Sequence, residues 1–244
     1  MAYKIVIEGI DGSGKNTQSH LLKERLESLG YSVALISFPD YNDNSGKVIL
    51  DYLKDNYKAS EDPLTSAIQI GSLYATNRLV TLIKKDEDGL NFFDKEDQYD
   101  FVIFDRYTTS NQIHQSANMY AKIKDVFDND KKRMSFITGY LNWVNSYEFD
   151  TLKLPKYDLC IYLTNNPKNS IENITKRSDS EHVGDKHETI EHLTDAKRVE
   201  SYVISHLGWK TVVSTDGDKM RDKHEISCDV YNILKDVLKH REGK

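Results

Sequence analysis

The chain has 244 residues, a formal net charge of −6 and 30% charged residues. This length suits one large α/β domain or two small ones, and the acidic balance argues against a nucleic-acid binder, which needs a basic face. No apolar run approaches the ~20 residues of a membrane span, the first residues lack the marks of a signal peptide, and two cysteines are too few for a disulfide framework. We therefore expect a cytoplasmic protein that binds neither nucleic acid nor membrane.

Strand-like and helix-like segments alternate along the chain. Short apolar runs predict strands at Tyr3–Gly9, 31–38, 99–105, 157–164 and 209–215. Hydrophobic periodicity predicts helices up to residue 30, at 45–57, 63–85, 109–127, 131–148 and 188–206, one opening at 166, and a last one to about 240. The polar, mixed stretch at 175–187 is a candidate mobile loop.

Five buried-looking strands separated by helices predict a single α/β domain over residues 1–244, built on a five-stranded parallel, doubly wound sheet. In such sheets ligands bind beyond the carboxyl ends of the strands. The residues that directly follow the strands are therefore the first candidates for a functional site.

A glycine-rich stretch, EGIDGSGKNTQ, runs from Glu8 to Gln18 between the first predicted strand and the first predicted helix. This is the context of a phosphate-binding loop, whose pattern is G-x-x-x-x-G-K-[ST]. The glycines allow a tight turn that aims N–H groups at phosphate oxygens, and Lys15 would reach the β- and γ-phosphates. Asp11 is either a turn-former or a carboxylate that faces a second substrate.

Asn16 stands where the pattern requires a hydroxyl. Its side-chain oxygen is a neutral acceptor, and Mg²⁺ accepts carbonyl oxygens while keeping several waters. The alternative is that Asn16 only caps the start of the helix.

The sequence DRYTTSNQIHQ follows the third predicted strand. Asp105 stands at the end of this strand, where its carboxylate would lie near a metal ion. Arg106 can make two parallel hydrogen bonds to a phosphate. Ser110, Asn111 and His114 then offer hydrogen-bonding groups on the first turns of a helix, although such groups could also form a solvated face.

Tyr74 and Arg78 lie four residues apart, on one face of a predicted helix. They could be a packed aromatic ring beside a surface arginine. They could also bind a nucleobase, with the base stacked on the ring of Tyr74 and the arginine bonded to its edge.

The chain resembles the thymidylate kinases, in the nucleoside-monophosphate kinase group of P-loop proteins. The residues that carry the resemblance are EGIDGSGKNTQ, SFPDY, YATNR, FDRYTTSN and LPKYDLCIYL, in family order, and they extend over nearly the whole chain. The resemblance implies ATP- and Mg²⁺-dependent phosphorylation of dTMP to dTDP. It also implies a mobile lid at about 176–188, an acceptor-binding region at about 38–85, and a homodimer.

The same resemblance implies a role for each matching residue. ATP would contact Gly9, Asp11, Gly12, Ser13, Gly14, Lys15, Asn16, Thr17 and Arg177. The acceptor would contact Asp11, Phe38, Tyr41, Tyr74, Arg78, Arg106, Ser110, Asn111 and His114. The catalytic residues would be Lys15, Asp105, Arg106 and Arg177, with Lys186 as a rival lid cation, and Asn16 and Asp105 would hold Mg²⁺.

Two departures from the family keep other readings open. Asn16 replaces the hydroxyl residue, and Tyr41 stands where many members have an arginine for the acceptor phosphate. One alternative is a broader kinase of dUMP or of a modified pyrimidine monophosphate. Another is a nucleotide-binding regulatory protein that has lost catalysis, and a third is a P-loop ATPase with a protein partner. Extra residues near 84–99 and 119–131 have no assigned role.

Overall fold

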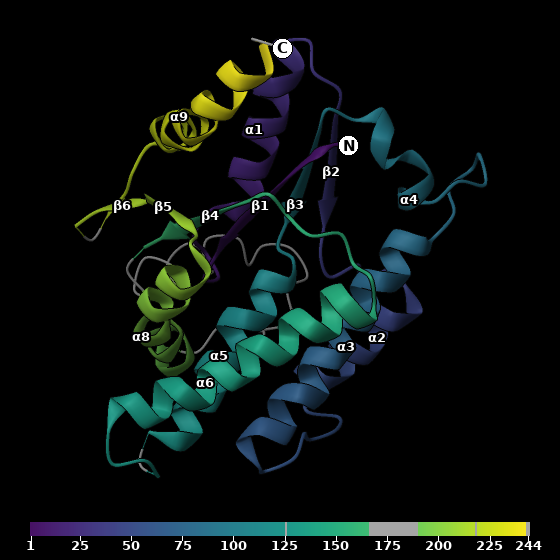
Figure 1. Ribbon diagram of the computed structural model, residues 1–244. Coiled ribbons are helices and arrows are strands. Elements are labelled where there is room, and N and C mark those ends of the chain that lie inside the picture. The colour runs from purple at the N-terminus through teal and green to yellow at the C-terminus, as the bar shows by residue number, and fades with distance from the viewer. Residues whose placement is uncertain (125, 166–189, 218, 243–244) are drawn as a thin grey trace.

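The fold is built on a central parallel sheet, seen in Figure 1 in a computed structural model that describes residues 1–124, 126–165, 190–217 and 219–242. Its strand order is β2-β3-β1-β4-β5. The strands are β1 (Tyr3–Gly9), β2 (Val33–Ser37), β3 (Phe101–Asp105), β4 (Leu159–Thr164) and β5 (Lys210–Val213). The predicted α/β class with a five-stranded parallel sheet is therefore confirmed.

Helices cover both faces of the sheet (Figure 1). They are α1 (Lys15–Ser28), α2 (Asn44–Leu53), α3 (Pro63–Ile83), α4 (Phe92–Lys95), α5 (Thr108–Ile123), α6 (Asp130–Asn145), α8 (Ile190–Leu207) and α9 (Lys223–Glu242). Helices α1 and α9 pack on one face, and α3, α5, α6 and α8 pack on the other. None of the described helices is long and apolar enough to cross a membrane.

Strand β1 shows how the alternation of side chains builds the two cores. Ile5 and Ile7 point into the core beneath α1 and α9, whereas Val6 belongs to the core on the opposite face. All three are buried, because successive side chains of a strand point to opposite sides of the sheet. A central strand covered by helices on both faces is therefore largely apolar, and the charged residues of β1, Lys4 and Glu8, are both buried.

The strand register brings the two main motifs together. Ile7 of β1 pairs with Asp105 of β3, and Gly9 of β1 pairs with Leu163 of β4. The phosphate loop that leaves β1 and the Asp105–Arg106 pair that leaves β3 therefore emerge side by side at the carboxyl edge of the sheet.

The structure departs from the predicted elements in three places. The predicted helix 131–148 ends early at Asn145, and the chain continues in the π-helical turn η2 (Ser146–Thr151). The unassigned stretch near 84–99 contains α4 and the 3-10 turn η1 (Glu96–Gln98). A small hairpin, β6 (Thr215–Asp216) with β7 (Lys219–Met220), follows the sheet.

Two predicted features near the fourth strand lie outside the described residues. They are the helix opening at 166 and the mobile loop or lid at about 176–188, which carries Arg177 and Lys186.

Candidate active site

The phosphate loop between β1 and α1 requires glycine at two points. A Cβ on Gly9 would lie 2.6 Å from the carbonyl oxygen of Leu163 and 2.6 Å from Ser13 Oγ. Gly14 is the N-cap of α1 at a φ of 93°, a left-handed conformation that favours glycine. The loop thus closes tightly against β4 and delivers Lys15 to the first turn of α1, with Thr17 two residues further on.

Lys15 is buried at the centre of this loop. Its Nζ donates hydrogen bonds to the carbonyl oxygens of Gly9 at 2.8 Å and Ile10 at 2.9 Å, and lies 3.7 Å from Asp11 Oδ1. Burial, together with the positive charge of Arg106, lowers the pKa of Lys15 to about 8. The ammonium group contacts two neutral carbonyls and the carboxylate of Asp11, which it shares with Arg106. Its positive charge is therefore only partly neutralised and can attract an anion that enters the loop.

Arg106 shares that carboxylate. Its Nη2 donates to Asp11 Oδ1, and its Nη1 lies 3.5 Å from His114 Nε2. Burial alone would raise the pKa of the Asp11 carboxyl, but the charges of Arg106 and Lys15 hold it well below its usual range. Asp11 is therefore an ionised carboxylate between two cations, which supports its interpretation as a functional group rather than a mere turn-former.

Asp105 and Asn16 meet at the edge of the same cluster. Asn16 Nδ2 donates to Asp105 Oδ2 at 3.1 Å, and Ser37 Oγ lies 3.5 Å from the same oxygen. The reading of Asn16 as a helix cap is wrong, because Gly14 is the cap residue and makes no side-chain hydrogen bond. Because the side-chain nitrogen of Asn16 is bonded to Asp105, the amide oxygen of Asn16 is left for another partner. This oxygen and the carboxylate of Asp105 are the kind of ligand that Mg²⁺ prefers.

Two buried carboxylates hold the start of α5. Glu8 accepts hydrogen bonds from Thr109 Oγ1 and Ser110 Oγ, both at 2.7 Å. Glu148 accepts from Thr108 Oγ1 at 2.7 Å and Asn111 Nδ2 at 2.8 Å. The first four residues of α5 therefore do not form a solvated face, because each donates a hydrogen bond to a buried acid. His114, one turn later, is also buried, and its Nε2 lies 3.5 Å from Arg106 Nη1.

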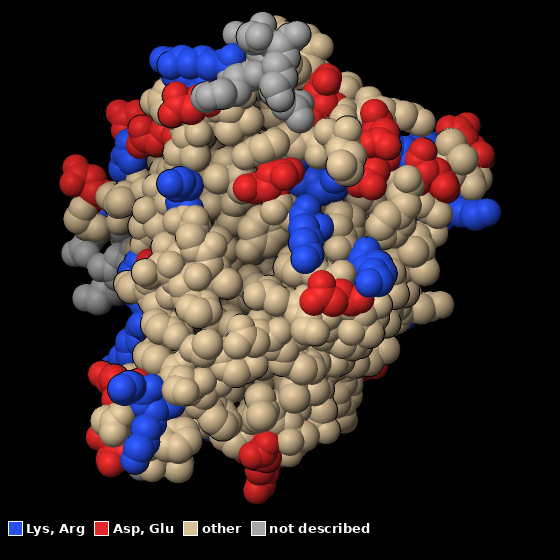
Figure 2. Space-filling model, in the orientation of Figure 1, with Lys and Arg blue, Asp and Glu red and all other residues tan. Residues whose placement is uncertain are grey.

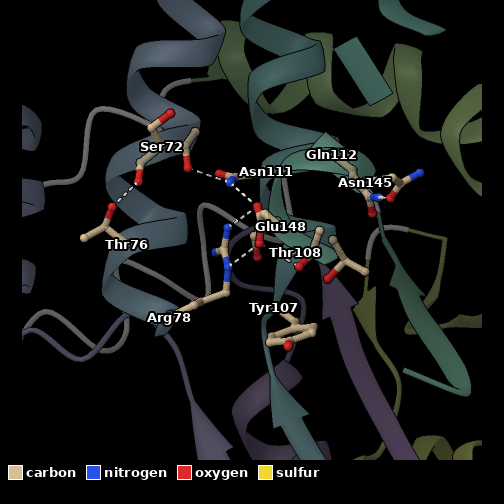
Figure 3. A network of polar contacts seen from close by, with 12 residues as sticks. Ser72, Thr76, Arg78, Tyr107, Thr108, Asn111, Gln112, Asn145 and Glu148 are labelled. Carbon is tan, nitrogen blue, oxygen red and sulfur yellow. Dashed lines mark hydrogen bonds and ion pairs between the residues drawn. The ribbon is translucent and has the colours of Figure 1, made fainter. Parts of the chain in front are cut away.

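Arg78 lies in the same network (Figure 3). It is 2% exposed, so the reading of a surface arginine is wrong. Its Nε and Nη2 donate to Glu148 Oε2 at 2.8 Å and Oε1 at 2.6 Å. One edge of the guanidinium is thus committed to protein, and the two hydrogens of Nη1 and the second hydrogen of Nη2 are left to meet a ligand.

The other predicted acceptor residues lie in different surroundings. Phe38 is buried and packs on Phe104 and Tyr107, and its contact with the acceptor stays a prediction. Tyr74 packs at the edge of a small cluster between α2 and α3. Tyr41, in the loop after β2, is 39% exposed.

The sequence reasoning missed Glu8 and Glu148 as parts of the site. Glu8 had a signal, because it is an acidic residue that directly follows the apolar run Ile5–Ile7 in a central strand. Glu148 had none, because it stood at the end of a predicted amphipathic helix where acidic residues are ordinary.

Comparisons with known proteins identify relatives of this chain. A family model described as thymidylate kinase matches residues 7–130. The thymidylate kinase of African swine fever virus (isolate Pig/Kenya/KEN-50/1950) is 26% identical over 187 residues, which cover 70% of this chain and 75% of that protein. The thymidylate kinase of Mycobacterium tuberculosis (strain ATCC 25618 / H37Rv) is 30% identical over 162 residues, which cover 65% of this chain and 64% of that protein.

A solved thymidylate kinase from Candida albicans has the same fold, with a TM-score of 0.64 and 23% identity, over 98% of this chain and 93% of that one. The family model spans the phosphate loop, Arg78, Asp105 and Arg106 together with the polar start of α5. Because that model covers residues 7–130, just over half of the 244 residues, this chain belongs to the thymidylate kinase family.

Proposed function

We propose that this kinase transfers the γ-phosphoryl group of ATP to dTMP and releases dTDP and ADP. The observation that carries the proposal is the cluster of Lys15, Asp11 and Arg106 at the carboxyl edge of the sheet. In it, two cations from neighbouring strand ends converge on one carboxylate. Membership of the thymidylate kinase family supports dTMP as the acceptor.

Phosphoryl transfer needs in-line positioning and neutralisation of charge more than covalent help from the protein. Lys15 would exchange its bonds to the carbonyls of Gly9 and Ile10 for the β- and γ-phosphates of ATP. Arg106 would leave Asp11 in part and fork onto the acceptor phosphate. A phosphate monoester has its second pKa near ~6 and is largely ionised at neutral pH, so no strong general base is required.

A magnesium ion would be held by Asp105 and by the amide oxygen of Asn16, directly or through water. It would supply positive charge that neutralises the negative charge developing on the transferring phosphoryl group. In the described residues no group of three or more acidic, histidine or cysteine side chains could hold a metal ion alone.

On the acceptor side, Tyr74 would stack on the pyrimidine, while Arg78 and Asn111 would read its edge. Ser110, fixed by Glu8, would complete that recognition, and His114 beside Arg106 would lie near the sugar. Tyr41 would donate a neutral hydrogen bond near the acceptor phosphate. The catalytic lid cation, Arg177 or Lys186, lies outside the described residues, and its role stays a prediction.

A panel of monophosphates tests the proposal. ADP formation from ATP is measured with dTMP, dUMP and dCMP, with and without Mg²⁺. We expect turnover with dTMP that requires Mg²⁺. Equal efficiency with dUMP would favour the broader kinase. ADP formation that does not depend on any monophosphate would indicate an ATPase, and no ADP formation at all would indicate a protein that has lost catalysis.

We also propose that the protein is a homodimer that associates through α3 and α6. The sequence of α6 is charged only in its first four residues, 130–133, and Figure 2 shows a largely uncharged surface over the rest of this helix. The only charged residue in the sequence of α3 is Arg78, which is buried. Uncharged surface of this extent is typical of contacts between subunits. The cytoplasmic location expected from the sequence stays a prediction.

A further inference from the structure

Glu148 is a fully buried carboxylate beneath the proposed pyrimidine site, with an exposed fraction of 1%. It accepts hydrogen bonds on both oxygens (Figure 3). Oε2 accepts from Arg78 Nε and Thr108 Oγ1, and Oε1 accepts from Arg78 Nη2 and Asn111 Nδ2. A carboxyl group that accepts on both oxygens is ionised, and its single charge is matched by that of Arg78.

We infer that Glu148 is a positioning residue that makes this site select a 4-oxo pyrimidine, by fixing which atoms of Asn111 and Arg78 face the base. The inference rests on the proposed function, in which these two residues read the edge of the base. In this role Glu148 determines whether Asn111 and Arg78 present a hydrogen-bond donor or an acceptor to the base.

The orientation of Asn111 is the first step. Its Nδ2 donates to the carbonyl oxygen of Gly71 at 2.9 Å and to Glu148 Oε1 at 2.8 Å. An amide nitrogen carries two hydrogens, so both are committed to these acceptors. The carboxamide can then offer a ligand only its oxygen, an acceptor. Thymine and uracil have an N3–H donor to meet it, whereas the N3 of cytosine is itself an acceptor.

The orientation of Arg78 is the second step. Glu148 binds the edge formed by Nε and Nη2, so the donors that remain for a ligand are the two hydrogens of Nη1 and the second hydrogen of Nη2. A donor complements the 4-oxo group of thymine or uracil and repels the 4-amino group of cytosine. Arg78 and Asn111 therefore present a donor beside an acceptor, the pattern of a 4-oxo pyrimidine.

The local backbone is shaped to deliver these groups. The π-helical turn η2 carries Glu148 into the interior, and π turns concentrate at functional sites. On the facing helix, a Cβ at Gly71 would lie 2.9 Å from Tyr140 Oη. Glycine there allows α3 to bring its carbonyl within reach of Asn111.

A purely structural ion pair is the competing explanation. Replacing a buried ion pair by apolar residues of similar volume is often neutral for stability, whereas removing one partner leaves an uncompensated charge. If Glu148 and Arg78 only stabilised the fold, apolar replacement of both would preserve substrate recognition. The double variant therefore tests whether the pair takes part in recognition at all. Glu148→Gln keeps Arg78 and so separates the role of Glu148 from that of Arg78.

The test compares Glu148→Gln and the double variant Arg78→Met/Glu148→Leu with Leu234→Ala, a core variant on α9. Measured quantities are Tm, kcat, the KM for ATP, and kcat/KM for dTMP and for dCMP. For Glu148→Gln and for the double variant we expect the KM for dTMP to rise at least ~10-fold, with the KM for ATP changed less than ~2-fold. The preference for dTMP over dCMP should fall at least ~10-fold. Leu234→Ala should lower Tm and leave the KM for dTMP and the preference for dTMP over dCMP unchanged.

Unchanged KM and unchanged preference in a folded Glu148→Gln protein would overturn the inference, as would an equal shift in Leu234→Ala. Should Glu148→Gln fail to fold, Glu148→Asp decides, because it keeps Arg78 and the buried charge but is one methylene too short to hold Arg78 and Asn111 in the same orientation. Wild-type recognition of dTMP by that variant would also overturn the inference. Failure of the proposed function is separate, because it would show as absent dTMP turnover in the wild-type protein.

Discussion

Arg106 has a backbone φ of 64°, a left-handed conformation that non-glycine residues rarely adopt. Such a conformation costs on the order of 1 kcal/mol and persists where the surrounding contacts hold it. The backbone N–H of Arg106 donates to the carbonyl oxygen of Ile7, and its guanidinium donates to Asp11. This backbone conformation directs the side chain of Arg106 towards Asp11 in the phosphate loop.

Replacing this side chain by methionine should abolish most of the activity. We expect Arg106→Met to lower kcat with dTMP by ~100-fold or more, because a charged donor aimed at transferring phosphates is typically worth ~3 kcal/mol. Steady-state kinetics measures this. The control is Arg106→Lys, which keeps the charge but cannot make two parallel hydrogen bonds to a phosphate, so its kcat should lie between those of the wild-type protein and Arg106→Met. Wild-type turnover in Arg106→Met would remove Arg106 from the mechanism.

Lys15 should give ATP binding a pH dependence. Its pKa is lowered to about 8, and bound phosphates would raise it. Below pH 8 Lys15 is already charged, so ATP binds without taking up a proton there. Above pH 8 binding requires proton uptake, so affinity should fall by up to ~10-fold per pH unit.

Isothermal calorimetry from pH 7 upwards measures this slope, and the dependence of heat on the buffer reports the proton uptake. Lys15→Arg is the control, because a guanidinium stays protonated throughout this range. Its affinity should be weaker but without the break near pH 8. A break of equal size in Lys15→Arg would assign the titration to another group.

At the level of elements, α4 shows what the residues near 84–99 contribute. Asn91 and Asp94 form a capping box that starts this short helix. Phe92 then packs against the core on Phe104, with ring centroids 6.1 Å apart, whereas its neighbour Phe93 is 38% exposed. The segment therefore covers the core beside β3 instead of projecting as a free insertion.

The two adjacent phenylalanines provide a matched test. Phe92→Ala should lower the free energy of unfolding by ~2 kcal/mol, less than the ~3–5 kcal/mol of a fully buried phenylalanine, because Phe92 is only partly buried. Phe93→Ala should lower it by less than ~1 kcal/mol. Chemical denaturation measures both, and kcat should stay unchanged in each. Equal losses in the two variants would mean that α4 does not contribute through the contact of Phe92 with the core.

The sequence predicted the elements that follow from local pattern. Strands β1, β3 and β4 and helix α3 with its cap at Asp62 are where the periodicity and capping signals put them. The convergence of Lys15 and Arg106 followed from the rule for the carboxyl ends of parallel strands.

The features that could not be predicted from the sequence depend on contacts between residues that are far apart in the chain. No local signal distinguishes the π turn that buries Glu148 from the last turn of an amphipathic helix. The burial of Arg78 depends on Glu148, seventy residues later in the chain. The burial of Phe38 depends in the same way on Phe104 and Tyr107 from β3 and the loop after it.

For the whole molecule, the surface of α6 argues for association. Residues 134–145 contain no charged side chain. Gly139, in the middle of α6, is exposed, and a Cβ there would meet nothing within 4 Å. Glycine inside an exposed helix costs ~1 kcal/mol relative to alanine. That cost is explained if a second copy of the chain packs closely against this position.

Gly139→Arg tests this association without disturbing the protomer. We expect the wild-type protein to sediment as a dimer at micromolar concentration and the variant as a monomer, because a charged side chain at the centre of an interface is costly to desolvate. The variant monomer should remain folded, since arginine favours the helix more than glycine does. Leu29→Arg, at an exposed position just after α1, adds the same charge elsewhere and should leave the dimer intact. A dimeric Gly139→Arg would place the interface on another face, and a monomeric wild-type protein would leave the glycine in α6 without this explanation.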